Sequence, residues 1–234
     1  MRSPLTRAVT RALVLFASAA ACLAGGPALG QQDTFSGVER IVAVGDVHGD
    51  CAQLVTVLRA ASVIDANENW IGGRTHLVQT GDVLDRGPDS RKAMDLLMKL
   101  EKQAADANGA VHALIGNHEA MVLMGDTRYV SEGENKAFGG EEEYAKAMSA
   151  QGKYGKWIRS HNAAVKVNGI LFAHAGITPY CKDMSLADIN KAIRTELDDA
   201  NASATGMGII MSPAGPLAGV STGSFRFSLP SRTS

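Results

Sequence analysis

The sequence is poor in cysteine and in aromatic residues, and it has no cluster of basic side chains. It contains three cysteines, and aromatic residues make up 5% of the chain. Its lysines and arginines are scattered, whereas nucleic-acid binding depends on neutralising phosphates with grouped basic side chains. The sequence therefore argues against a nucleic-acid-binding protein. Hydrophobic residues, at 45% of 234, nevertheless suffice for the core of one domain of ordinary size.

The sequence also lacks an apolar run long enough for a comfortable membrane span. The apolar stretch near the N-terminus, Ala12–Gly25, is short and rich in alanine and glycine. It follows three arginines and precedes Ala28-Leu29-Gly30, a small-x-small pattern typical of a signal-peptide cleavage site. We therefore expect residues 1–30 to be a signal peptide that directs the protein to the periplasm or outside the cell, with no stable membrane insertion after cleavage. An uncleaved anchor is the alternative.

Removal of a signal peptide would leave a mildly acidic chain with two cysteines. The first thirty residues contain three of the 23 basic residues and none of the 24 acidic ones, so the remainder has 20 basic residues and a formal charge of −4. An oxidising compartment would allow Cys51 and Cys181 to pair. Two unpaired, half-buried thiols are an equally compatible outcome.

Three glycine-rich segments each follow an apolar run and precede a helical pattern. They are Gly45–Gly49 (GDVHG), Gly81–Gly87 (GDVLDRG) and Gly116–Glu119 (GNHE). This alternation is typical of an α/β fold with a mostly parallel sheet, in which ligands bind at the carboxyl ends of the strands. Five polar side chains should therefore meet at one edge: Asp46, His48, Asp82, Asn117 and His118. Carboxylates, imidazoles and an amide form the donor set of a divalent metal site.

The second half of the chain is less regular. Residues 125–155 are polar and rich in glycine, which indicates a lid or cap at the edge of the site. Ala163–Ala173 predicts a β-hairpin with an Asn-Gly turn, and His174 follows its second arm. Residues 201–234 consist largely of small and polar residues, so we expect a poorly ordered tail there. Three histidines without a motif around them are expected to be structural: His76, His112 and His161.

Taken together, the three segments resemble the phosphoprotein phosphatase family of metallophosphoesterases. The patterns of that family are GDxHG, GDxxDRG and GNHE, and all three occur here in order without substitution. Gly125–Val130 and Leu171–Ile177 look most similar to the Shewanella-like branch of bacteria and plants. The resemblance implies a calcineurin-like metallophosphoesterase fold, with central β-sheets flanked by helices, over residues 38–200. The C-terminal part of that fold is expected to be missing.

The resemblance also implies two divalent metal ions. Manganese is expected, and iron or zinc would suit the same donors. Asp46 and His48 would hold the first ion, Asn117 and His174 would hold the second, and Asp82 would bridge both. A hydroxide shared by the two ions would attack phosphorus.

Three further roles concern the transferred phosphate and the leaving group. Asp85 would orient His118, which would give a proton to the departing oxygen. Arg86 would bind two phosphate oxygens with its planar guanidinium. Asn117 and His118 are expected to contact the substrate as well.

The sequence departs from the family pattern after His174. In the Shewanella-like branch, a Pro-Leu-Trp-Tyr-Arg-Gly segment supplies a second phosphate-binding arginine, and a later histidine completes the second metal site. Here Gly215-Pro216-Leu217 is followed by Ala218-Gly219-Val220, and no histidine follows His174. A frameshift or premature end in the gene would explain the change, and a genuine lineage with a short C-terminus is the alternative.

The sequence therefore predicts an exported, metal-dependent phosphatase that hydrolyses phosphate monoesters. The expected substrates are phosphorylated proteins, at serine, threonine or tyrosine with a lean toward tyrosine, or small phosphoesters. Two alternatives stay open. One is a bis-nucleoside polyphosphate hydrolase, and the other is a catalytically impaired remnant that only binds metal.

Overall fold

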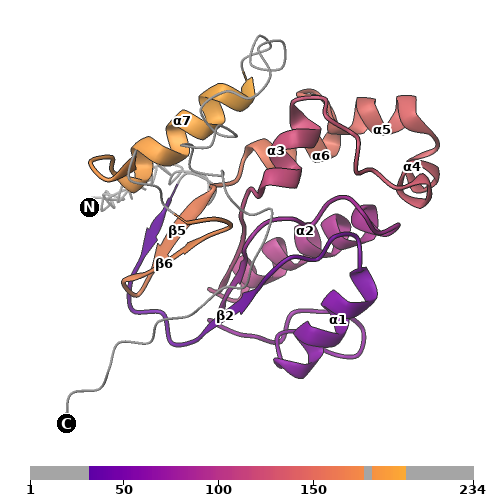
Figure 1. Ribbon diagram of the computed structural model, residues 1–234. Coiled ribbons are helices and arrows are strands. Elements are labelled where there is room, and N and C mark those ends of the chain that lie inside the picture. Colours follow the sequence, from indigo (N-terminus) through magenta and orange to yellow (C-terminus); the bar gives the residue numbers. More distant parts are fainter. Residues whose placement is uncertain (1–31, 177–180, 199–234) are drawn as a thin grey trace, which may run out of the picture.

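The computed structural model describes residues 32–176 and 181–198 (Figure 1). The strands are β1 (Thr34–Phe35), β2 (Ile41–Val44), β3 (His76–Gln79), β4 (Ala110–Ala113), β5 (Ala164–Val167) and β6 (Ile170–Ala173). The helices are α1 (Cys51–Ala60), α2 (Ser90–Asp106), α3 (Asn117–Leu123), α4 (Glu132–Phe138), α5 (Glu141–Met148), α6 (Lys153–Arg159) and α7 (Leu186–Asp198). The expected signal peptide and the expected tail from residue 201 lie outside the described residues and stay predictions.

A parallel three-stranded sheet lies at the centre of the fold. Its strands pair in the order β2-β3-β4, with Ile41 opposite His76 and His76 opposite Ala110. Helix α1 connects β2 to β3 and α2 connects β3 to β4, so the predicted strand–helix alternation is confirmed. The parallel order brings the residues that follow the three strands to one edge of the sheet.

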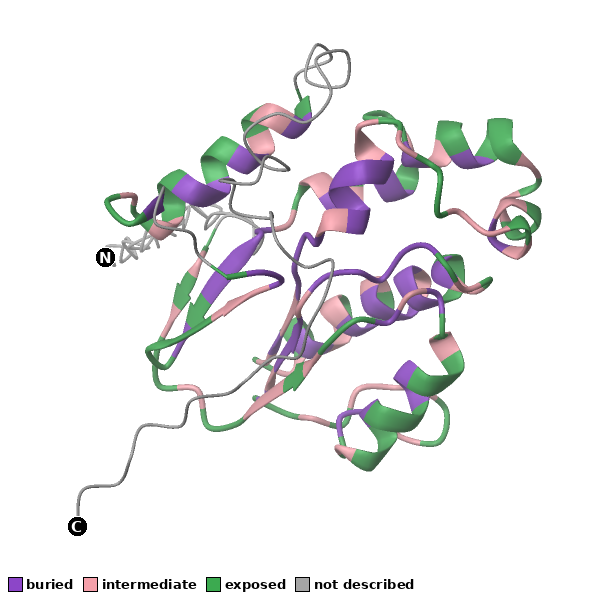
Figure 2. Cartoon of the chain, viewed as in Figure 1, coloured by how far each residue is buried: buried purple, intermediate pink, exposed green. Residues whose placement is uncertain are grey.

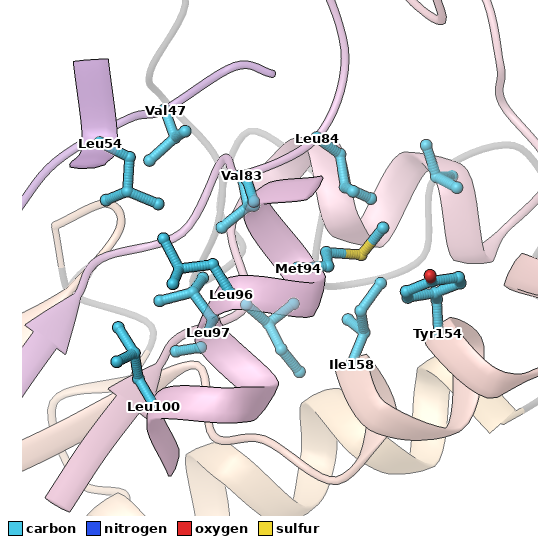
Figure 3. Packing of buried hydrophobic residues seen from close by; sticks show 14 of the residues in the cluster. Val47, Leu54, Val83, Leu84, Met94, Leu96, Leu97, Leu100, Tyr154 and Ile158 are labelled. Carbon is cyan, nitrogen blue, oxygen red and sulfur yellow. The ribbon is translucent and has the colours of Figure 1, made fainter. Parts of the chain in front are cut away.

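The central strand β3 is buried on both faces. Leu77 belongs to the larger hydrophobic cluster, which includes the inner sides of α1 and α2. The next residue, Val78, points to the opposite face and packs with Leu114, Val165 and Val167 between the two sheets. Figure 3 shows part of the larger cluster. The chain thus forms layers, with helices on one face of the parallel sheet and a second sheet on the other.

The second sheet has the order β1-β5-β6. Strands β5 and β6 form the predicted hairpin, and its turn residues Asn168 and Gly169 have φ of 49° and 81°, which suits an Asn-Gly turn. Helix α7 packs against β5. Strand β6 lies at the edge of this sheet, with Ile170 and Leu171 exposed.

Residues 125–155, expected from their polar composition to form a lid or cap at the edge of the site, are largely helical. They contain α4, α5 and the start of α6, and Tyr144, Met148 and Tyr154 are buried in the larger hydrophobic cluster. Figure 2 shows α5 with an exposed side and a buried side. The large apolar residues of the helices in this segment are spaced so that they face the core, which overall composition does not reveal.

Three smaller points bear on the sequence predictions. The helical pattern after the first motif forms α1, and the Asp50 carboxylate accepts from Gln53 N–H at its start. Cys51 and Cys181 are both free thiols, so the pairing that the sequence allowed is not formed. Within residues 32–176 and 181–198, no helix is long and apolar enough to cross a membrane.

Candidate metal centre

The segments after β2 and β3 are joined by backbone hydrogen bonds. The N–H of His48 donates to the carbonyl of Asp82, and the N–H of Gly49 donates to that of Val83, both at 2.9 Å. The two segments cross so closely that a Cβ on Gly49 would lie 2.6 Å from the carbonyl oxygen of Gly87. Glycine is therefore required at this crossing, which fixes the first two sequence motifs relative to each other.

The segment after β3 has an unusual backbone conformation. Asp82, Asp85 and Arg86 have φ of 58°, 69° and 65°, a left-handed region that residues other than glycine seldom adopt. The N–H of Arg86 donates to the carbonyl of Tyr129 at 2.9 Å, so the residues after α3 help to hold this conformation. Such strain persists only where the surrounding structure supports it, and it is concentrated at functional sites.

Glu119 provides much of that support. Its buried carboxylate accepts from the N–H groups of Asp82, Val83, Leu84 and Gly116, at 2.7, 2.8, 3.2 and 2.8 Å. The side chains of Val83 and Leu84 point into the hydrophobic core near α2 (Figure 3). The segment is therefore anchored on one side by a carboxylate and on the other by apolar packing.

His48 presents a free nitrogen to the site. Its Nδ1 is bonded to the carbonyl oxygen of Leu84 at 3.0 Å, which fixes the proton on Nδ1 and leaves a lone pair on Nε2. Nε2 is buried without a hydrogen-bond partner and lies 3.6 Å from both Asp46 Oδ2 and Asp82 Oδ2. An imidazole lone pair facing two carboxylates fits a cation between them.

His174 is held in a similar way, through a backbone carbonyl at Nδ1. Its Nδ1 donates to the carbonyl of Thr80 at 3.0 Å, and Nε2 lies 2.9 Å from Asn117 Oδ1 and 3.3 Å from Asp82 Oδ2. Burial lowers the pKa of His174, but the bond to Asp82 and its charge outweigh burial, so the net shift is upward. Three acceptor atoms facing one another require a proton or a metal ion between them.

Asp82 lies at the centre of the cluster. Its Oδ1 accepts from the N–H of His118 at 3.0 Å, which leaves Oδ2 directed at the imidazoles. Burial raises the pKa of Asp82, but hydrogen bonds and charges from His174 and His118 outweigh it, so the pKa is lowered. Asp82 is therefore held as a carboxylate, the form that binds a cation.

His118 differs from the other two site histidines because its Nδ1 faces a carboxylate. Nδ1 lies 2.6 Å from Asp85 Oδ2, and Nε2 lies 3.3 Å from Arg86 Nη2. Burial lowers the pKa of His118, but the Asp85 hydrogen bond and the charges of Asp82 and Asp85 outweigh it, so the net shift is upward. The Asp85 partner thus favours the protonated imidazole that a proton donor needs.

All the side chains singled out in the sequence come together here, although the grouping differs in detail. Ligand atoms lie within 4.8 Å of one another in two sets: His48 with Asp82 and His118, and Asp46 with Asp82 and His174. The resemblance pairs Asp46 with His48, and these two also lie close together, with Asp46 Oδ2 3.6 Å from His48 Nε2. Asp82 belongs to both sets, so the donors form one continuous cluster. Asp46 is its most exposed member.

Two residues of the site were not assigned a role from the sequence. Glu119 was noted only as the end of a motif, although its place three residues after Gly116 is a recognisable signal for a carboxylate that caps a helix start. Gln79, the last residue of β3, is fully buried, and its amide bonds to Gly81 N–H and to the Gly81 carbonyl at 3.1 and 2.6 Å. The sequence signal that could have identified Gln79 is its place as a polar residue at the end of an apolar strand.

Comparison with known proteins agrees with this geometry. The calcineurin-like phosphoesterase family model matches residues 39–210. The chain is 36% identical over 163 residues to Shewanella-like protein phosphatase 1 of Plasmodium berghei, covering 68% of this chain and 45% of that protein. It is 44% identical over 101 residues to Shewanella-like protein phosphatase 2 of Arabidopsis thaliana, covering 43% and 26%. The chain thus spans less than half the length of these relatives.

A solved structure gives the same result for the fold. The cold-active protein-tyrosine phosphatase of a psychrophilic Shewanella species superposes with a TM-score of 0.73 and 33% identity, covering 82% of this chain and 61% of that one. The predicted metallophosphoesterase fold is therefore confirmed. The chain belongs to the calcineurin-like phosphoesterase family, and within it to the Shewanella-like branch of the phosphoprotein phosphatases.

Proposed function

We propose that this protein is a metal-dependent phosphatase that hydrolyses phosphate monoesters. The observation that carries the proposal is the shared position of Asp82 Oδ2, which lies 3.6 Å from His48 Nε2 and 3.3 Å from His174 Nε2, next to the His118–Asp85 pair. A central carboxylate with donors on both sides suits two cations, and a proton donor beside them suits cleavage of a P–O bond.

The donor set indicates which residues would hold the metal ions. Asp46, His48, Asp82, Asn117 and His174 provide carboxylate, imidazole and amide donors, a mixture that favours manganese, iron or zinc, and we propose manganese. When bound, the ions supply Lewis acidity toward the phosphoryl oxygens and lower the pKa of coordinated water. The protein keeps the donors ready through the Leu84 and Thr80 carbonyls, which fix the protons of His48 and His174 on Nδ1.

His118 would protonate the leaving group. Its Nδ1–H would be held by Asp85. Nε2 lies 3.3 Å from Arg86 Nη2, a nitrogen that can only donate, so Nε2 would carry the transferable proton once Arg86 turns from it to the phosphate. As the P–O bond breaks, this proton moves to the departing oxygen, and the Asp85 carboxylate balances the charge of the imidazolium beforehand. Asp85 is completely buried, so water does not weaken that interaction.

Arg86 would bind the phosphate. In the described structure its Nη2 lies near His118 rather than in an ion pair with a carboxylate. A guanidinium can donate to two phosphate oxygens at once and stabilise the charge that spreads over them during transfer. The left-handed φ of Arg86 keeps this side chain beside His118.

We also propose phosphotyrosine as the preferred substrate class. Tyr129 is 46% exposed, and its ring centroid lies 5.2 Å from that of His118. An aromatic leaving group next to His118 would therefore lie against an exposed aromatic ring, and such contacts favour aryl over alkyl groups. The tyrosine phosphatase activity in the name of the Shewanella neighbour supports the same choice.

Export to the periplasm or outside the cell remains part of the proposal. It rests on the basic and apolar pattern of the first thirty residues. Fractionation of the producing cell, with N-terminal sequencing of the recovered protein, would test both the location and the cleavage after Gly30.

The activity itself is tested with the full chain and p-nitrophenyl phosphate. We expect turnover that requires added Mn²⁺, disappears with a chelator, and is lost in Asp82→Asn, which keeps the shape of the shared ligand but removes its charge. Phosphotyrosine, phosphoserine and diadenosine tetraphosphate then separate the substrate classes. Turnover that resists the chelator, or that Asp82→Asn retains, would contradict the proposal. A preference for the dinucleotide would favour the polyphosphatase alternative.

A further inference from the structure

A group of polar side chains near Asp85 is buried without hydrogen-bond partners. Among the described residues, the atoms without partners include Asp85 Oδ1, Ser90 Oγ, both carboxyl oxygens of Glu134 and the Tyr144 hydroxyl. Asp85, Ser90 and Glu134 are 0% exposed, and Tyr144 is 2% exposed. An unpaired buried polar group costs free energy, so several of them in one place need an explanation.

These side chains act on one another. The Ser90 hydroxyl and the backbone N–H of Asp85 interact with the Glu134 carboxyl, although neither reaches full hydrogen-bond geometry. The charges of Glu134 and Asp85 in turn raise the pKa of Tyr144, on which burial has the largest effect. The four residues come from the segment after β3 and from α2, α4 and α5. They form one buried polar cluster, which we call the Asp85 cluster.

Helix α4 is tied to the segment that contains Asp85. Ser131 accepts from the Glu134 N–H at 3.1 Å at the start of α4, and its hydroxyl donates to the carbonyl of Gly87 at 3.0 Å. The Cβ position of Gly133 would lie 2.7 Å from Pro88 Cβ, so helix and segment are in close contact. Glu134 is therefore fixed next to Asp85.

In the described part of the chain, no cation is among the groups that act most strongly on Glu134. The titratable groups that act on it are Asp85 from the segment after β3, Glu119 from α3 and Tyr144 from α5, and Ser90 at the start of α2 is polar but uncharged. Burial raises the pKa of Glu134 to about 7; the Ser90 interaction opposes this shift, and the Asp85 charge adds to it. A protonated carboxyl is a hydrogen-bond donor, which Asp85 Oδ1 lacks.

We propose that Glu134 is a positioning residue for the proton donor of this site: as a neutral acid, it donates into the Asp85 cluster and keeps the Asp85 carboxylate turned toward His118. Asp85 Oδ2 is occupied by His118, so the orientation of the carboxylate depends on what holds Oδ1. The role of His118 as proton donor belongs to the proposed function, and this inference rests on it.

The first test requires no turnover. A proton in a bond as short as that between His118 Nδ1 and Asp85 Oδ2 gives a resonance far downfield in proton NMR, and loss of that resonance in His118→Asn assigns it. We expect the full chain with Mn²⁺ removed to show it, and Glu134→Gln to retain it, because glutamine keeps the shape and a donor. Glu134→Ala should shift it upfield or lose it. A signal that is unchanged in Glu134→Ala would overturn the proposal.

The second test separates positioning from simple loss of stability. A poor leaving group needs the proton of His118, whereas p-nitrophenolate departs without one, so a misplaced proton donor slows an alkyl phosphate more than p-nitrophenyl phosphate. We expect Glu134→Ala to raise the turnover number on p-nitrophenyl phosphate, divided by that on the alkyl phosphate, by about tenfold or more. Glu134→Gln should leave this ratio unchanged. Glu132→Ala, on the exposed side of the same helix, is the control.

Two kinds of turnover result would contradict the proposal in different ways. Equal losses on both substrates in Glu134→Ala, or a Glu134→Gln variant as impaired as Glu134→Ala, would overturn the positioning role. If His118→Asn also lowers both substrates equally, the role of His118 in the proposed function fails instead, independently of the NMR result.

A third measurement remains available if Glu134→Ala does not fold. Because the folded-state pKa of Glu134 is raised, the wild-type chain loses stability as pH rises from about 4.5 to about 7, and glutamine does not. The Tm of Glu134→Gln relative to wild type should therefore increase over this range. If Tm changed with pH in the same way in wild type and in Glu134→Gln, Glu134 would not be neutral in the folded protein, and the proposal would be wrong.

Discussion

Each histidine of the metal centre is specialised by the atom that faces its Nδ1. In His48 and His174 that atom is a backbone carbonyl oxygen, which fixes the proton on Nδ1 and leaves Nε2 as a lone pair directed at Asp82. In His118 it is the carboxylate of Asp85, which instead favours a proton on both nitrogens. The same residue type thus serves as a ligand in two places and as a proton donor in the third.

His118→Asn tests this division. Asparagine cannot deliver a proton, so we expect turnover of p-nitrophenyl phosphate to fall by about 10²–10⁴, the usual contribution of a general acid. Metal content, measured on the same preparation by mass spectrometry, should stay near the wild-type value. His161→Asn is a matched control, because His161 also faces a carboxylate, Glu101, at 2.9 Å but lies outside the site. Loss of bound metal in His118→Asn would show that His118 is a ligand.

Glu119→Gln tests the support beneath the metal centre. The Glu119 carboxylate accepts from four buried backbone N–H groups with two oxygens, whereas a glutamine amide has only one oxygen. Some of these N–H groups would therefore face the NH₂ group of the glutamine. We expect a loss of about 2–4 kcal/mol in unfolding free energy, together with weaker Mn²⁺ binding, by urea denaturation and metal titration. Glu142→Gln on the surface of α5 should change neither. An unaltered Mn²⁺ affinity would show that Glu119 stabilises the fold but does not contribute to the metal centre.

At the level of elements, the sequence predicts whatever depends on local pattern. The strands β2, β3 and β4 are short apolar runs, each followed by a glycine-rich motif, so the edge that collects Asp46, Asp82 and Asn117 follows from the chain order. The buried packing of residues 125–155 was not predicted, because three helices with few apolar residues differ little in composition from a polar surface segment. The closeness of Glu134 to Asp85 depends on how α4 packs, and no local pattern contains that information.

The β5–β6 hairpin offers a prediction at this scale. Asn168 accepts from Val38 N–H at 3.0 Å and donates to the Val38 carbonyl at 2.7 Å, and its φ is 49°. Asn168→Gly should cost about 1 kcal/mol from the lost bonds, and Asn168→Ala about 1 kcal/mol more from backbone strain. Thermal unfolding of both variants measures the two contributions. Equal Tm values for the two would show that the turn is relaxed.

At the level of the whole molecule, the two sheets meet over a pair of histidines. His112 Nε2 lies 3.0 Å from His76 Nδ1, and the ring of Phe35 from β1 packs against both imidazoles. Burial, followed by the charges of His76 and His161, lowers the pKa of His112 to about 3. Burial also lowers the pKa of His76. The contact between the sheets therefore requires neutral histidines.

Acid should consequently weaken the molecule through this pair. In the unfolded chain His112 takes up a proton near its ordinary pKa, whereas in the folded chain it does so only near pH 3, so stability is lost as pH falls between these values. The loss attributable to His112 is of order 3–5 kcal/mol. His112→Gln, which does not titrate, should show a shallower decline of Tm between about pH 6.5 and pH 4. Identical slopes in the two proteins would rule out His112 as the cause.

The separation of the metal donors along the chain has a consequence for biosynthesis. His174 lies 57 residues after Asn117 and 94 residues after Thr80, whose carbonyl fixes its proton. A nascent chain that has emerged only as far as the third motif has Asp46, His48, Asp82 and Asn117 but no imidazole to complete the second half of the cluster. Full metal loading must therefore wait until the β5–β6 hairpin has formed and docked, which makes it a late event in the folding of the protein.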